Sequence, residues 1–197
     1  METVIQLNSN AKLSEHFTLG EFTRSNHPEI YNIPSHEAIA NLKRLCTWLE
    51  YLRKRYNEFL DKPSGKAERI HSTPSPSSRE EGKTEGRVLP SSLEEGPGVE
   101  EKALLPIIIN SGYRSPQLNR KVGGAPTSNH LTGCAADIRV SSFEQAIRYA
   151  SILLDYADES HQDFDELLIE KGRFGAIWLH FAVRFRDNRH KVLYINA

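Results

Sequence analysis

The sequence predicts an α+β fold, an antiparallel sheet with flanking helices, and three observations support this prediction. Apolar residues recur at intervals of three and four between residues 35 and 60, which is typical of a long helix with one buried face. Short segments at 106–110 and 135–140 are rich in apolar residues and predict buried strands. Three further strand-like segments follow one another near the C-terminus, and their succession favours an antiparallel meander.

Capping residues mark where the predicted helices begin. Thr18 and Glu21 have the spacing of a capping box, which predicts a short helix at that point. Ser35 is expected to cap the long helix, which we expect to reach about Leu60. A further helix is predicted over 142–157. The apolar residues that we expect on its buried side are Phe143, Ile147, Ala150 and Leu154.

The C-terminal strands are predicted over 164–170, 176–184 and 191–195. Each segment alternates or concentrates large apolar residues over a length that suits a strand. Because only short connections separate them, we expect them to pair in order as neighbours.

The segment from Asp61 to Lys102 differs sharply in composition from the rest of the chain. It has no aromatic residue, and it contains five prolines and five glycines. The run Pro76–Gly82 returns with small changes as Pro90–Gly96, which is too little for a solenoid. Such a segment cannot bury enough apolar surface to offset its ordering entropy. We therefore predict one domain over 1–197, interrupted by a disordered surface insertion at about 61–102.

Composition excludes several classes of protein. The chain has 25 Lys and Arg against 26 Asp and Glu, a balance that argues against a partner of duplex nucleic acid. No apolar stretch is long enough for a membrane span, and the first ten residues do not resemble a signal peptide. Localisation stays open, with synthesis in the cytoplasm and release to a cell wall as one route. The two cysteines, Cys46 and Cys134, are too few for a disulfide framework or a four-cysteine zinc module.

The segment from Asn110 to Asp137 carries most of the residues that suit chemistry. It contains four glycines, which allow tight turns and close backbone approach. A loop of this length between two predicted strands is often functional. The polar and aromatic candidates within it are Tyr113, Arg114, Ser128, His130 and Asp137.

His130 and Asp137 are candidates for a metal site that needs a third ligand from elsewhere. His180 fits this role because it lies in a predicted strand of large apolar residues. Two histidines and a carboxylate make a zinc site with one open position for water, whose pKa zinc lowers to about 7. Taken singly, each residue has a plainer reading: His180 as a core residue, Asp137 as a turn residue and His130 as a surface residue.

The run from Ser128 to Asp137 follows the pattern S-x-H-x-x-G-x-A-x-D. It resembles the zinc-binding signature of the D-Ala-D-Ala carboxypeptidase and dipeptidase family of metallopeptidases. The flanking segments 111–115 and 119–124 resemble the substrate-side loop of the family, and the late Trp178-x-His180 resembles its third-ligand strand. The N-terminal LSEHFTLGEFTRS and the helix after it resemble the small single-domain subgroup of bacteria and phages. The resemblance implies a Hedgehog/DD-peptidase-like fold and Zn²⁺ held by His130, Asp137 and His180.

The same resemblance implies roles for residues beside the metal. Arg114 would bind the substrate carbonyl oxygen and stabilise the negative charge that develops there. Ser128 would either bind substrate or fix the loop. Tyr113, on the substrate side, would mainly pack and shape the loop.

One position departs from the pattern of the family. Many members carry their general base three residues before the last histidine ligand, where this chain has Ile177. We favour Glu170 as the base, since it ends the adjacent predicted strand. Glu166 is the alternative, because residues four apart on a strand share a face.

The resemblance implies a zinc metallopeptidase that hydrolyses peptidoglycan stem peptides at or near D-Ala, as a carboxypeptidase or an endopeptidase. The alternative is a catalytically inactive, zinc-stabilised module of the same fold that binds peptide or cell wall, and Ile177 motivates it. We expect no nucleic-acid partner and no membrane-spanning segment.

Overall fold

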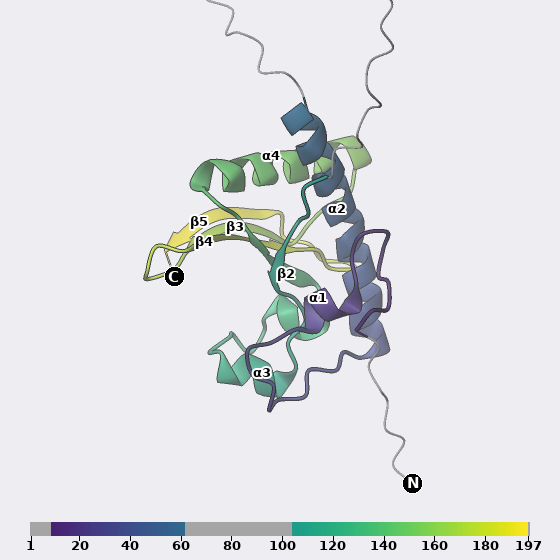
Figure 1. The fold of residues 1–197 in the computed structure, drawn as a ribbon, viewed down its shortest axis with the longest axis vertical. Coiled ribbons are helices and arrows are strands. Elements are labelled where there is room, and N and C mark those ends of the chain that lie inside the picture. Colours follow the sequence, from purple (N-terminus) through teal and green to yellow (C-terminus); the bar gives the residue numbers. More distant parts are fainter. Residues whose placement is uncertain (1–8, 62–103, 197) are drawn as a thin grey trace, which may run out of the picture. The chain divides into compact units, whose positions relative to one another are not determined.

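The computed structural model describes residues 9–61 and 104–196 (Figure 1). The predicted insertion lies outside the described residues except for Asp61, which ends a helix. The helices are α1 (Leu19–Thr23), α2 (His36–Asp61), α3 (Pro116–Lys121), the short 3₁₀ helix η1 (Asn129–Thr132) and α4 (Phe143–Ser160). The strands are β1 (Ile109–Ser111), β2 (Ala135–Arg139), β3 (Glu166–Lys171), β4 (Ile177–Ala182) and β5 (Lys191–Asn196).

The predicted α+β class is confirmed: helices flank one five-stranded sheet. None of the described helices is both long and apolar enough to span a bilayer.

The two N-terminal helices begin where the capping residues predict. The backbone N–H and the hydroxyl of Thr18 both donate to the carboxylate of Glu21, at 2.7 and 2.8 Å. The hydroxyl of Ser35 accepts from the N–H of Ala38 at 3.1 Å. Each contact satisfies a polar group that the first turn of a helix would otherwise leave unpaired.

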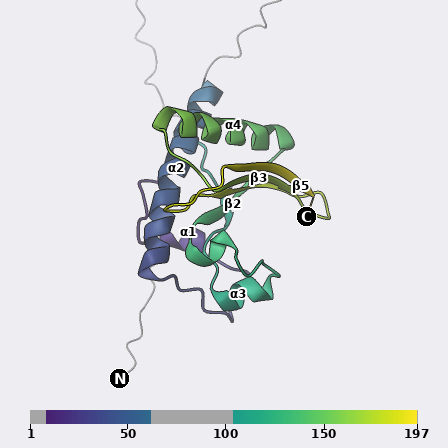
Figure 2. The ribbon, with the colours of Figure 1, turned by 180° about the vertical axis from the view of Figure 1, so that it is seen from behind.

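The hydrophobic core lies between α2, α4 and one face of the sheet (Figures 1 and 2). Trp48 of α2 is fully buried, and its ring packs against those of Tyr156 in α4 and Phe181 in β4, with centroids 4.7 and 5.2 Å apart. Removing this apolar surface from water is the main stabilising contribution to the fold. The fully buried leucines of α2 are Leu42, Leu45, Leu49 and Leu52.

The predicted buried side of α4 is right for Ala150 and Leu154, which are half-buried against the core, and wrong for Phe143 and Ile147. Phe143 and Ile147 are exposed, and the helix instead buries Ala146, Tyr149, Leu153 and Ala157. The small alanines allow close approach to the neighbouring elements, and the ring of Tyr149 packs edge-on against Tyr56 of α2, with centroids 4.8 Å apart. Two adjacent apolar stripes on one helix look alike in the sequence, and tertiary packing selects between them.

The predicted meander is also wrong, because the strand order is β1-β2-β4-β3-β5 and β5 pairs with β3 in parallel. The other three pairings are antiparallel. β4 pairs with β2 on one edge and β3 on the other, so it has no free edge for β5. Since β4 ends beside the start of β3, the chain joins the outer edge of β3 and runs in the same direction.

The register of the central strands sorts their side chains onto two faces. His180 pairs with Asp137 of β2 and with Leu168 of β3. Directly paired residues share a face, and residues two apart on a strand share it too. This face therefore carries Asp137, His180, Glu166 and Glu170, whereas the opposite face packs against α2 and α4.

Candidate metal centre

Two local features of the loop before β2, a cap and a glycine, hold His130 in position. The hydroxyl of Ser128 caps η1 by accepting from the N–H of His130 at 3.3 Å. Gly133 ends η1 with a φ of 70°, and a Cβ there would lie 2.5 Å from the carbonyl oxygen of Ala38 in α2. Only glycine suits both the left-handed conformation and the close contact. The loop is thereby pressed against α2, with His130 buried.

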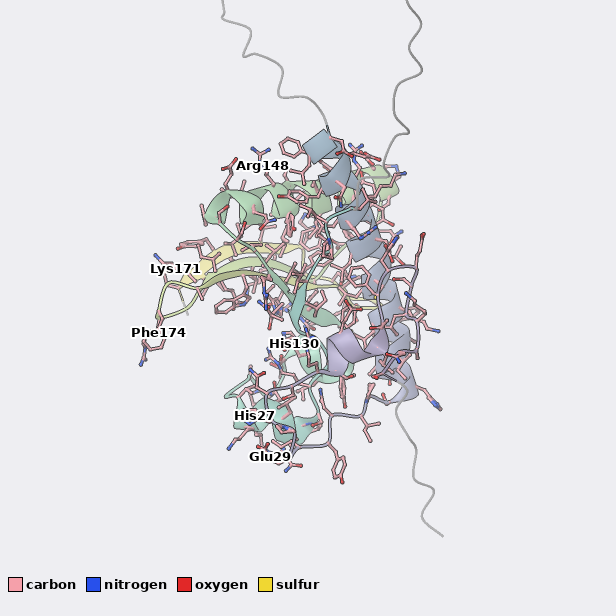
Figure 3. The ribbon with its side chains drawn as sticks, viewed as in Figure 1. His27, Glu29, His130, Arg148, Lys171 and Phe174 are labelled. Carbon is pink, nitrogen blue, oxygen red and sulfur yellow. The ribbon has the colours of Figure 1, made fainter. Side chains whose placement is uncertain are left out.

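A hydrogen bond fixes which nitrogen of His130 is free. Its Nδ1 lies 2.6 Å from the carbonyl oxygen of Gly112. A carbonyl oxygen only accepts, so Nδ1 carries a proton and Nε2 is the nitrogen that can bind a metal ion. That Nε2 lies 3.3 Å from Oδ1 of Asp137. In Figure 3, His130 lies between the sheet and α3.

His180 completes the group from β4. Its Nδ1 lies 2.9 Å from Oδ1 of Asp137, directly across the two paired strands. One potential ligand atom from each of His130, Asp137 and His180 lies within 4.8 Å of the others, and all three residues are buried. Nitrogen and oxygen ligands about 2 Å from a tetrahedral ion are a little over 3 Å apart, so the group could hold a metal ion.

Arg114 adjoins this group on the side of Asp137. Its Nη2 donates to Oδ2 of Asp137 at 2.7 Å, and its Nε donates to the hydroxyl of Ser111 at 2.9 Å. The backbone N–H of Arg114 also donates to the carbonyl of His130 at 3.0 Å. Burial would raise the pKa of Asp137, but His130 and His180 hold it well below its usual range. The carboxylate therefore stays ionised, as a metal ligand must.

Comparison with known families supports the motif that contains these ligands. Residues 77–159 match the family described as Peptidase M15, which is less than half of the chain. The match confirms the resemblance to the M15 metallopeptidases. It includes His130 and Asp137, and it ends before His180. No curated protein matches the chain.

Both candidate bases of the M15-like site lie on the face of the sheet that carries His180. Glu166 is the nearer, with its Oε2 3.6 Å from Nε2 of His180. It is also bound to Arg189, whose Nη2 lies 2.9 Å from Oε1, and to the side-chain amide of Asn129, at 2.9 Å. Its contact with His180, helped by Arg189 and Asn129, lowers the pKa of Glu166 to about 2.

Glu170 is in a different environment. It is half-buried, it forms no ion pair among the described residues, and it lines the same pocket as His180. Burial raises the pKa of Glu170 above its ordinary value, although the charge of His180 opposes this. The carboxylate of Glu170 accepts a hydrogen bond from Trp178, but unlike that of Glu166 it is in no ion pair among the described residues and has a raised pKa.

Ile177, the departure from the M15 pattern, lies in a regular part of β4. Its neighbour Trp178 pairs with Glu170, and Ile177 pairs with Lys171. Residue 177 is three positions from His180, so its side chain is on the opposite face of the sheet. An acidic residue at 177 in this strand geometry would point away from the metal group.

The structure contains a network of charged residues next to the site that the sequence-based predictions do not include. Asp165 is fully buried and receives two hydrogen bonds from Arg189, at 2.8 and 2.6 Å, and one from the amide of Asn129, at 2.7 Å. Nε of Arg184 lies 3.1 Å from the same carboxylate. The one signal in the sequence is Asp165 itself, an acidic residue within the predicted strand 164–170, because a buried charge requires partners.

The remaining predicted residues have mixed positions. Tyr113 is buried, and its carbonyl accepts from the amide of Asn32 at 2.9 Å, which suits a residue that shapes the loop. Ser128 caps η1 and also lines the pocket beside His180 and Glu170, which has a volume of about 390 Å³. Cys46 and Cys134 are both buried free thiols.

Proposed function

We propose that the protein is a zinc metallopeptidase that hydrolyses peptidoglycan stem peptides at or near D-Ala. One observation carries the proposal: His130, Asp137 and His180 form a buried group, and Asp137 and His180 share a sheet face with Glu170, which forms no ion pair among the described residues. The family match supports a metallopeptidase, and the substrate is proposed from the resemblance to D-Ala-D-Ala carboxypeptidases. We also propose a single Hedgehog/DD-peptidase-like domain that is interrupted by an insertion.

The donor set suits zinc better than a hard cation. Two imidazole nitrogens and one carboxylate are a typical set for catalytic zinc, whereas calcium and magnesium prefer oxygen ligands alone. His130 would bind through Nε2, because Gly112 holds its Nδ1 proton. His180 would bind through Nδ1, which faces Asp137. When bound, zinc supplies a Lewis acid that polarises the scissile carbonyl and lowers the pKa of water.

We assign the general base to Glu170. A base must be free to accept a proton from the attacking water and to pass it to the leaving amine. Glu170 has a raised pKa and forms no ion pair among the described residues. Glu166 is a weaker candidate, since its pKa is about 2 and Arg189 and Asn129 occupy its oxygens.

Glu166 instead suits a positioning role. If Nδ1 of His180 binds the metal, its Nε2 carries a proton that needs an acceptor. Glu166 lies 3.6 Å from that nitrogen. A carboxylate in this position orients a histidine ligand and raises its basicity.

Arg114 would stabilise the transition state. Its guanidinium has five N–H donors in a planar fork, and the described contacts use those to Asp137 and Ser111. The remaining donors can bind the substrate carbonyl oxygen as negative charge develops on it. The hydrogen bond to Asp137 keeps the guanidinium at the edge of the metal group.

The test is hydrolysis of purified muropeptides by the zinc-loaded protein, followed by mass spectrometry. Loss of a terminal D-Ala would indicate a carboxypeptidase, and separation of cross-linked peptides would indicate an endopeptidase. Glu170→Gln should lower kcat by about 10² to 10⁴ while zinc stays bound. Glu166→Gln is the matched control, because it removes the same charge from the same strand, and it should lower kcat less at saturating zinc.

Two results would contradict this proposal. If Glu170→Gln leaves hydrolysis intact, the base is assigned wrongly. If the native protein binds zinc and cleaves none of the muropeptides, the inactive binding module becomes the better explanation.

A further inference from the structure

A second pocket, of about 240 Å³, adjoins the metal group through Arg114, which contacts Asp137. Its walls come from the segment after α1, from β1 and from the loop that leads into α3. The basic residues that line it are Arg24, His27 and Arg114, and the polar side chains of Ser111 and Tyr113 line it as well. No carboxylate of the described residues lines it. In Figure 3, His27 lies near α3, at the end of the described part opposite Arg148 of α4.

Arg114 connects this pocket to the metal group. It lines the pocket and donates to Asp137, whereas His180 lines the pocket that also contains Glu170. Asp137 contacts both Arg114 and His180. Each of the two pockets is therefore lined by a residue that contacts Asp137, so a peptide held with its scissile carbonyl at the metal can reach both.

Arg24 has unused hydrogen-bonding capacity. Its Nη2 donates to the carbonyl of Ile109 at 3.3 Å, and it forms no ion pair within residues 9–61 and 104–196. The histidine that also lines this pocket already has an acidic partner, since Nδ1 of His27 lies 3.1 Å from the carboxylate of Glu29. Glu29 does not line this pocket. The contact to Ile109 holds the Arg24 stem against β1, and its other donors remain available.

We propose that this pocket binds a carboxylate of the peptide substrate, with Arg24 as the main partner. The inference rests on the proposed function and adds a preference for anionic peptides. A guanidinium binds a carboxylate through two parallel hydrogen bonds, which gives direction as well as attraction. Arg24 lies outside residues 77–159, the part of the chain that matches the family model. The carboxylate is either the C-terminal one or that of an internal acidic residue.

The experiment compares three synthetic pentapeptides that end in D-Ala-D-Ala. The first has a free C-terminus and an internal glutamate, the second has a C-terminal amide, and the third has glutamine in place of the glutamate. Hydrolysis is measured with the native protein and with Arg24→Gln. Binding is measured by fluorescence anisotropy of the same labelled peptides with zinc-loaded Glu170→Gln protein, with and without Arg24→Gln.

Arg24→Gln should raise KM and Kd for the first peptide about tenfold, since a hydrogen bond between charged groups is lost, with little change in kcat. The effect of Arg24→Gln should disappear for one of the two neutralised peptides. If it disappears for the C-terminal amide, the pocket recognises the C-terminal carboxylate. If it disappears for the glutamine peptide, the pocket recognises the internal glutamate. Arg24→Lys should restore part of the affinity. Arg148→Gln, which removes an exposed arginine of α4, should change nothing.

An equal effect of Arg24→Gln on all three peptides, or no effect on the first, would overturn the inference. Failure of the proposed function gives a different result, because then no peptide is hydrolysed. The anisotropy comparison still decides whether Arg24 distinguishes the charged peptide from the neutral ones.

Discussion

Asp137 and His180 face each other across β2 and β4, with Oδ1 2.9 Å from Nδ1. Regular strand pairing, rather than a flexible loop, sets the distance between these two residues. The first prediction concerns metal binding. Asp137→Asn should weaken zinc affinity at least about 100-fold, because a neutral amide replaces a charged ligand.

Zinc content by atomic absorption, with a chelator competition to give affinity, measures this effect. His36→Gln is the control, since His36 is an exposed histidine at the start of α2. Circular dichroism should show that both variants remain folded. Stoichiometric zinc in Asp137→Asn at native affinity would exclude Asp137 as a ligand.

The second prediction is that zinc binding releases a proton from His180. Burial would lower the pKa of His180, but the hydrogen bond to Asp137 and the contact with Glu166 raise it to about 9 in the metal-free protein. At pH 7 the imidazole is therefore protonated, whereas a metal ligand must be neutral. Calorimetry in buffers of different ionisation enthalpy should show about one proton released at pH 7 and fewer as the pH approaches 9.

The raised pKa of His180 also determines the direction in which the stability of the metal-free protein changes with pH. The protonated form of His180 stabilises the fold fully below about pH 6.5, the ordinary pKa of histidine. This contribution is lost as the pH rises through about 9. Denaturant midpoints measured from pH 6 to 9.5 should fall in the native protein, and they should fall less in His180→Gln.

The third prediction separates the two carboxylates of β3 by their effect on the metal. Glu166→Gln should lower zinc affinity about 10- to 100-fold, since it removes the charged acceptor beside Nε2 of His180. Glu170→Gln should leave the affinity nearly unchanged. The absorption spectrum of the cobalt-substituted protein should shift in the first variant, and equal effects of the two substitutions would contradict the division of roles.

The fourth prediction uses two glycines with the same backbone conformation. Gly133 and Gly123 have φ values of 70° and 73°. A Cβ at 133 would lie 2.5 Å from the carbonyl oxygen of Ala38, whereas a Cβ at 123 meets nothing within 4 Å. Alanine costs about 1–2 kcal/mol in this conformation at either site. Gly133→Ala should therefore destabilise the protein clearly more than Gly123→Ala, and urea denaturation compares the two.

Local sequence signals predicted the local structure of this chain well. The caps at Thr18 and Ser35 interact as expected, because a cap depends on residues three positions apart. The face of α4 and the place of β5 depend on elements distant in sequence. Phe143 and Ala146 both lie on apolar stripes of α4, and only packing against the rest of the fold decides which is buried.

The candidate site also has features that local sequence patterns predict and others that depend on residues distant in sequence. Strand parity placed Glu166 and Glu170 on one face, and the register of β3 with β4 agrees. The difference between them is not visible in the sequence, because it arises from Arg189 and Asn129, which bind Glu166 alone of the two. Long-range contacts of this kind determine which of two equivalent carboxylates forms ion pairs.

The fifth prediction tests whether the segment from 62 to 103 is needed for folding. Asn57, in the last turns of α2, exchanges two hydrogen bonds with the backbone of Leu105, at 3.0 and 2.7 Å. The described chain thus leaves and re-enters at nearly the same point. Replacement of residues 62–103 by a short Gly-Ser linker should preserve the melting temperature within a few degrees and keep zinc stoichiometric, because long and short loops differ little in closure entropy.

Asn57→Ala should destabilise the protein, since it leaves the N–H and the carbonyl of Leu105 without these partners. Loss of folding on linker replacement would contradict the proposed insertion within a single domain.

Gly112 links the metal group to the N-terminal part of the chain. Its carbonyl holds His130, and a Cβ on it would lie 2.6 Å from the carbonyl oxygen of Phe22 in α1. Phe22 is fully buried at this contact. A shortened protein that begins after α1 would lose the packing that keeps Gly112 in place, even though every proposed ligand is still present. Proteolytic removal of α1 would thus abolish metal binding although it removes none of the proposed ligands.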